Sequence, residues 1–230
     1  MEKVFKKHET LFTIALIVIY VVVNSYLKQN FGYTSIQSVI VNTILSILII
    51  AIIIAIKRVK YYGLTKTNNP KKFLYFIPLV IISLFNLRNG VHINNSSTEI
   101  IFHILTMINI GFLEEIIFRG FLFKMMEKDN VKTAIIVSSI TFGIGHIVNL
   151  LNGADFIPTL LQIGYAIAIG YMLVMVFHKS KSLIPCIIFH MVFNALSIFN
   201  VDNSAILSIV LLIVACLGYA IYINKSIKTE

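Results

Sequence analysis

Long apolar runs separated by short polar breaks are the main pattern along this chain. A membrane-spanning helix needs about 20 mostly apolar residues. Eight runs approach that length, at residues 10–27, 37–56, 73–88, 98–123, 133–151, 156–177, 182–199 and 204–223. The third run is short and the fourth is long. The pattern therefore predicts an all-α, polytopic membrane protein with about eight transmembrane helices.

The polar breaks between the runs contain turn-forming residues. Examples are TKTNNPKK at 65–72, RNGVHINNSS at 88–97 and NGADFIP at 152–158. Glycine, proline and asparagine at such positions end helices and form turns. The chain has no long linker and no low-complexity tract, so we expect residues 1–230 to form a single integral membrane domain.

Composition agrees with this interpretation, since 58% of the residues are hydrophobic and only 13% are charged. The formal net charge of +9 raises the question of a nucleic-acid partner. However, the basic residues lie in short breaks between apolar runs and do not form one amphipathic face. Their distribution favours a role in membrane topology, and no nucleic-acid partner is expected.

The positive-inside rule states that cytoplasmic loops carry an excess of lysine and arginine. With eight spans, 16 of the 19 basic residues fall on one side of the membrane. These are Lys3, Lys6, Lys7, Lys57, Arg58, Lys60, Lys66, Lys71, Lys72, Lys124, Lys128, Lys132, Lys179, Lys181, Lys225 and Lys228. Only Lys28 and Arg88 fall in the opposite loops. Both termini are therefore predicted to be cytoplasmic.

The N-terminal stretch MEKVFKKHET, followed by LFTIALIVIYVVV, has the basic and apolar parts of a signal peptide. No small-residue cleavage site follows it. We therefore expect residues 10–27 to be retained as the first span.

Three charges interrupt the fourth run, in the segment EEIIFR from Glu114 to Arg119. A lone charge at the centre of a spanning helix costs roughly 2.5–3.5 kcal/mol, so such residues are candidates for function. Residues four apart lie about 40° apart around a helix, whereas residues five apart lie about 140° apart. Glu115 and Arg119 can therefore form an ion pair, while Glu114 has no partner in its own helix.

Glu114 matches His146 of the next span in depth. Glu114 lies 13 residues from Glu127, and His146 lies 14 residues from Lys132. At about 1.5 Å per residue, both are roughly 20 Å from the cytoplasmic side, on adjacent antiparallel helices. A carboxylate facing a histidine in a protein interior suits general acid–base chemistry.

Span 182–199 adds His190 and Asn194, which lie four residues apart and hence on one face. Both side chains can donate hydrogen bonds, as a developing oxyanion requires. Gly111, Gly143 and Gly145 are expected to allow close helix packing. His8, His92, His103 and His178 are expected to be incidental, because they lie at ends, in loops or without polar partners.

These segments resemble a known family. EEIIFR, FGIGH (142–146) and HMVFN (190–194) are similar, in order and spacing, to the motifs of the CPBP (Abi) family. That family includes the type II CAAX prenyl endopeptidases and bacteriocin-processing or immunity enzymes. The resemblance covers about residues 98–200, which would form the catalytic core.

The resemblance implies a metal-independent intramembrane endopeptidase of the glutamate type, without a cofactor. Glu114 would activate water with help from His146. His190 and Asn194 would form the oxyanion hole, and Glu115 with Arg119 would support the site.

Three alternatives remain open at this stage. Glu114, His146 and His190 could bind zinc with water in a fourth position, although the H-E-x-x-H spacing is absent. The chain could instead be a non-catalytic membrane scaffold or immunity factor. A proton-coupled transporter also uses buried Glu and His, but no inverted repeat is visible.

The expected partners are membrane lipid and a hydrophobic or lipid-linked peptide or protein substrate. Relatives process prenylated CAAX termini or small peptides such as bacteriocins, so the substrate could be prenylated, bacteriocin-like or a signalling peptide. We expect a bacterial cell membrane as the location.

Overall fold

The structure is a computed structural model that describes residues 2–65, 76–201 and 206–227. Within these ranges the regular elements are all helical. They are α1 (Glu2–Lys7), α2 (Glu9–Phe31), α3 (Ile36–Ala55), α4 (Ile77–Ser83), η2 (Leu84–Leu87), α5 (Ser97–Glu115), the π-helix η3 (Ile116–Phe123), α6 (Lys124–Met126), α7 (Val131–Ile144), η4 (Gly145–Ile147), α8 (Val148–Leu151), α9 (Phe156–Ser180), α10 (Ile184–Ala195), η5 (Leu196–Phe199) and α11 (Ile206–Ser226).

The predicted all-α, multi-pass membrane architecture is confirmed. Six helices of the described chain are long and apolar enough to cross a membrane: Glu9–Phe31, Ile36–Ala55, Ser97–Met126, Val131–Leu151, Phe156–Ser180 and Ile206–Ser226. Each corresponds to a predicted span, although residues 204 and 205 of the last lie outside the described residues.

The remaining two predicted spans form shorter apolar helices, Ile77–Leu87 and Ile184–Phe199. At about 1.5 Å per residue they extend roughly 16 and 24 Å, less than the hydrocarbon thickness of about 30 Å. Each has a proline in its first turn and ends in a 3-10 turn. Residues 73–75 of the third prediction lie outside the described residues.

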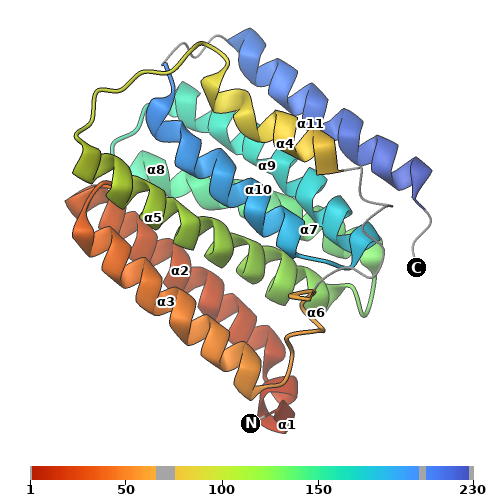
Figure 1. Cartoon of the computed structure of the whole chain (residues 1–230). Coiled ribbons are helices and arrows are strands. Elements are labelled where there is room, and N and C mark those ends of the chain that lie inside the picture. The colour runs from red at the N-terminus through yellow and green to blue at the C-terminus, as the bar shows by residue number, and fades with distance from the viewer. Residues whose placement is uncertain (1, 66–75, 202–205, 228–230) are drawn as a thin grey trace.

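The helices form one bundle with an inner and a peripheral set (Figure 1). α9 packs against α7 and α11, and α5 packs against α3 and α10. In an apolar stretch of 18 residues, half or more of the residues are buried in the Ser97–Met126 and Phe156–Ser180 spans, against 22–28% in α2, α3 and α11. Because the peripheral helices expose apolar side chains, we interpret their outer faces as the lipid contact surface.

Two of the three predicted packing glycines are confirmed. A Cβ on Gly111 would lie 2.7 Å from the Met191 backbone nitrogen, and one on Gly143 would lie 2.3 Å from Ile167 Cγ1. Gly111 thus lets α5 approach the α10 backbone beside His190. The prediction is wrong for Gly145, where a Cβ would meet no atom within 4 Å.

Candidate active site

The predicted pairing of Glu115 with Arg119 is confirmed. Arg119 Nη1 donates to Glu115 Oε1 at 3.0 Å, and neither side chain is exposed. The guanidinium also lies over the Phe142 ring, 4.3 Å from its centroid. Because a buried ion without a partner raises the free energy of the folded state, the Glu115 carboxylate and the Arg119 guanidinium each need the other.

The π-helix η3 begins directly after Glu115, and all its residues are buried. π-Helical turns are rare and frequently occur at functional sites. The wider turn changes the angular spacing of the side chains that follow. The Ser138 hydroxyl on α7 donates to the Phe118 carbonyl at 2.8 Å, so a neighbouring helix satisfies part of this irregular backbone.

His190 on α10 bridges the two adjacent glutamates. Its Nδ1 lies 2.7 Å from Glu115 Oε1, and its Nε2 lies 3.1 Å from Glu114 Oε2. The Nδ1 contact is a hydrogen bond, and the Nε2 contact is an ion pair when the ring is protonated. In that form, His190 and Arg119 balance the charges of the two carboxylates.

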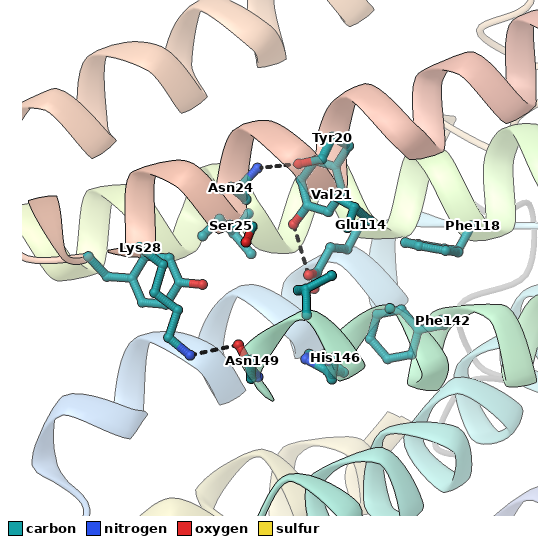
Figure 2. A pocket seen from close by; sticks show the side chains of 14 residues that line it. Tyr20, Val21, Asn24, Ser25, Lys28, Glu114, Phe118, Phe142, His146 and Asn149 are labelled. Atoms are coloured by element: carbon teal, nitrogen blue, oxygen red, sulfur yellow. Dashed lines mark hydrogen bonds between the residues drawn. The ribbon is translucent and has the colours of Figure 1, made fainter. Parts of the chain in front are cut away.

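Tyr20 on α2 makes a contact that the sequence analysis missed. Its hydroxyl donates to Glu114 Oε1 at 2.8 Å (Figure 2). Tyr20, Asn24 and Lys28 are spaced by four residues, so they form a polar stripe on an otherwise apolar span. That spacing is the signal in the sequence that could have identified α2 as part of the site. Glu114 is thus fixed from both α2 and α10.

A cavity of about 290 Å³ lies beside these residues, and we call it the site cavity. Glu114 and His146 line it from neighbouring helices, and Figure 2 shows them from the side of a smaller adjoining pocket that both also line. The site cavity is lined by Lys28, Tyr33, Asn86, His103, Met107, Ile110, Glu114, Phe142, His146, Asn149, Gln162, Tyr165, Ala166, Ile169, His190, Phe193, Asn194, Ser197 and Asn200. All four predicted catalytic residues therefore line one cavity.

His146 lies in the 3-10 turn η4, just beyond α7. Its Nδ1 is 3.4 Å from Gln162 Nε2, and its ring packs edge-on against Phe142. In the described part of the chain it makes no hydrogen bond to Glu114, although both side chains line the same cavity. Glu114 and His146, which were predicted to lie at equal depth, thus line the same cavity without a hydrogen bond between them in the described part of the chain.

Asn194 and His103 meet on the α5–α10 side of the cavity. The Asn194 side chain makes no hydrogen bond to the described residues, whereas its backbone carbonyl lies 3.3 Å from His103 Nε2. His103 Nε2 is also 3.2 Å from the Ser197 hydroxyl. The expectation that His103 is incidental is wrong, because this buried histidine lines the cavity and ties α5 to η5.

The zinc alternative gains no support from this geometry. Over residues 2–65, 76–201 and 206–227, no three His, Cys, Asp or Glu side chains come together in positions that could hold a metal ion. In particular, both nitrogens of His190 face carboxylates, so neither is free to bind a metal.

Comparison with known proteins identifies one family. Residues 96–196 match the family described as type II CAAX prenyl endopeptidase Rce1-like. No curated protein and no solved structure matches the chain. The matched segment contains Glu114, His146, His190 and Asn194, while α2 with Tyr20 lies outside it. Over residues 96–196 the chain is therefore similar to a family of CAAX-type endopeptidases, in a bundle with six described helices long and apolar enough to cross a membrane.

Proposed function

We propose that this endopeptidase is of the glutamate type and acts on a hydrophobic or lipid-linked peptide. The observation that carries the proposal is the position of Glu114. Its side chain is 12% exposed and lines the site cavity, while Tyr20 and His190 hold its two oxygens. A carboxylate has about four lone-pair sites, and Tyr20 and His190 use one each, so the Glu114 carboxylate can still accept a proton from water.

In the proposed reaction, Glu114 takes a proton from water as the water oxygen bonds to the scissile carbonyl carbon. The carbonyl oxygen becomes an oxyanion, which His146 and Asn194 stabilise by donating hydrogen bonds. The C–N bond then breaks, and Glu114 returns the proton to the departing amine. No other reactant is needed, because water supplies both the hydroxyl group and the proton.

His190 takes a different place in this scheme from the oxyanion hole expected at first. Both of its ring nitrogens contact carboxylates, so neither can donate to a third acceptor unless a contact opens. We assign His190 to positioning Glu114, together with the Glu115–Arg119 pair behind it. Asn194 keeps its expected place as an oxyanion donor. His146, expected at first to assist Glu114 in activating water, becomes the second donor in this scheme.

Part of the cavity lining bears on topology. Tyr33 follows α2, Asn86 lies in η2, and Asn200 follows η5, so all three lie at the helix ends that carry few basic residues. If the termini are cytoplasmic, the cavity extends to the helix ends on the side away from the cytoplasm. We propose on this basis that substrate and water reach Glu114 from the outer side of a bacterial cell membrane.

The test is hydrolysis by the purified full chain in lipid nanodiscs, using a library of hydrophobic, internally quenched peptides and mass spectrometry of the products. We expect cleavage that continues after exhaustive treatment with metal chelators. Activity that is lost on chelation and restored by Zn²⁺ would support the metalloprotease instead. A protein that binds library peptides without cleaving them would support the scaffold.

Tyr20→Phe is expected to lower kcat about tenfold while leaving the protein folded. The change removes only the hydroxyl that donates to Glu114 Oε1, and a hydrogen bond to a charged acceptor contributes about 1.5 kcal/mol, which is roughly tenfold in rate. Steady-state kinetics on a cleaved library peptide measure the effect. Tyr26→Phe, on the exposed face of the same helix, is the matched control. Equal kcat values for the two variants would remove Tyr20 from the site.

A further inference from the structure

A second cavity, of about 220 Å³, lies where three helical spans end. We call it the basic cavity, and it is lined by Lys60, Tyr61, Phe123, Lys124, Glu127, Phe177, His178 and Lys181. Lys60 follows α3, Lys124 begins α6, and Lys181 follows α9. Among the described residues it shares no lining residue with the site cavity. The basic cavity is therefore separate from the candidate active site, at the helix ends where most basic loop residues occur.

Positive charges outnumber negative ones around the basic cavity. Three lysines line it, whereas Glu127 is its one carboxylate in the described part of the chain. Glu127 forms an ion pair with Lys124. Lys60 and Lys181 form no ion pair with a described residue, so the lining keeps a formal excess of two positive charges.

Membrane topology explains why lysines occur in these loops, but it does not require that they line one cavity. Lys60, Lys124 and Lys181 come from three separate segments of the chain. Like charges that are brought together repel one another, which raises the free energy of the folded state. An anion bound among the lysines would offset this repulsion.

The lining of the basic cavity combines unused polar groups with an apolar wall. His178 Nδ1 is buried and has no hydrogen bond to a described residue. An ammonium group has three donors, so Lys60 and Lys181 can together donate several hydrogen bonds to one ligand. The Phe123 and Phe177 rings meet edge-on, with their centroids 5.9 Å apart. The lining therefore suits an anion with several acceptor oxygens, and its apolar wall tolerates an apolar group beside that anion.

We propose that the basic cavity binds a phosphate group, which accepts hydrogen bonds from Lys60 and Lys181 with the His178 ring as a third donor. A phosphate ester carries negative charge and three strong acceptor oxygens, and basic pockets between transmembrane helices bind phospholipid headgroups. The cavity volume of about 220 Å³ far exceeds the roughly 10–15 Å³ that admits one water. The group belongs either to an anionic phospholipid or to a soluble phosphate. The inference does not depend on the proposed peptidase function.

Two measurements on the purified full chain in neutral detergent micelles separate these sources. Native mass spectrometry compares the binding of phosphatidic acid with that of diacylglycerol, which lacks only the phosphate group. Isothermal titration calorimetry measures the binding of inorganic phosphate. We expect about tenfold to hundredfold tighter binding of phosphatidic acid than of diacylglycerol if the ligand is a lipid, because charge-assisted hydrogen bonds are at stake. Binding of inorganic phosphate without that preference identifies a soluble ligand.

The double variant Lys60→Gln with Lys181→Gln should lose most of this binding, and Lys60→Arg with Lys181→Arg should retain most of it. The matched control is Lys3→Gln with Lys132→Gln. It removes the same net charge from two exposed lysines that do not line the basic cavity. Because the two glutamine variants have equal charge, a difference between them reports the cavity and not the overall field of the protein.

A measurement on the wild-type chain covers the case in which the glutamine variant fails to fold. Lysine acetylation, followed by mass spectrometry, should show that the bound probe protects Lys60 and Lys181 at least several-fold, while Lys132 reacts as before. The inference is overturned if the wild type binds neither phosphatidic acid in preference to diacylglycerol nor inorganic phosphate. It is also overturned if the folded cavity variant binds as well as its matched control, or if the probe leaves Lys60 and Lys181 unprotected.

Discussion

Glu114→Gln is expected to lower kcat by about a thousandfold or more, with little change in folding. General acid–base groups typically contribute 10²–10⁴-fold, and the proposed reaction uses this carboxylate twice. Glutamine has the same shape, and its amide oxygen can still accept from the Tyr20 hydroxyl. What it cannot do is take the proton from water. The measurement is single-turnover hydrolysis of a cleaved library peptide by the protein in nanodiscs.

The matched control for this variant is Glu127→Gln, the same substitution directly after the end of the same span and beside a separate cavity. It should retain close to wild-type kcat. Comparable activity of well-folded Glu114→Gln and Glu127→Gln would contradict the glutamate mechanism. A loss confined to KM would instead make Glu114 a substrate-binding residue.

Arg119→Met is expected to destabilise the fold by about 3–5 kcal/mol, because it leaves Glu115 buried with only His190 to balance two carboxylates. Both side chains of the Glu115–Arg119 pair have no exposed surface, and a second Glu115 oxygen is already without a partner among the described residues. Reversible unfolding in mixed micelles measures the change in the free energy of unfolding. Activity should fall as the folded fraction falls. It should also fall in the protein that stays folded, because Glu115, which contacts His190, is no longer held by Arg119.

The double variant Glu115→Gln with Arg119→Met separates pairing from packing. Removing both charges leaves no isolated buried ion, so the double variant should be more stable than Arg119→Met alone. Lys6→Met removes one cation of an exposed pair with Glu2 and should change stability little. The stability losses of Glu115→Gln and Arg119→Met are also measured singly. If the loss in the double variant equalled the sum of these two losses, the pair would contribute no coupling energy.

Several features of the site could be predicted from local spacing. The pairing of Glu115 with Arg119 follows from helical periodicity, and it survives the π-helix that begins between them. The common location of Glu114 and His146 follows from their equal depth on antiparallel spans. The roles of Glu114, His146, His190 and Asn194 in catalysis stay predictions.

Other features could not be predicted because they depend on packing between distant segments. Nothing local to α10 indicates that His190 faces both glutamates, which depends on the close approach of α5 at Gly111. Tyr20 and Lys28 lie on α2, outside the matched segment, and the packing of α2 places Tyr20 against Glu114 and Lys28 in the lining of the site cavity. The short length of Ile184–Phe199 likewise appears only in three dimensions, whereas the third run is already short in the sequence.

The sequence by itself determined the all-helical membrane architecture, since apolar runs of this length must satisfy their backbone hydrogen bonds internally. It also determined which ionisable residues are buried in the spans, because an intramembrane charge is costly wherever the helix lies. Only the tertiary structure decided the partners of those charges. Contacts such as Tyr20 with Glu114, and Lys28 with Asn149, depend on the relative position of helices that are distant in sequence.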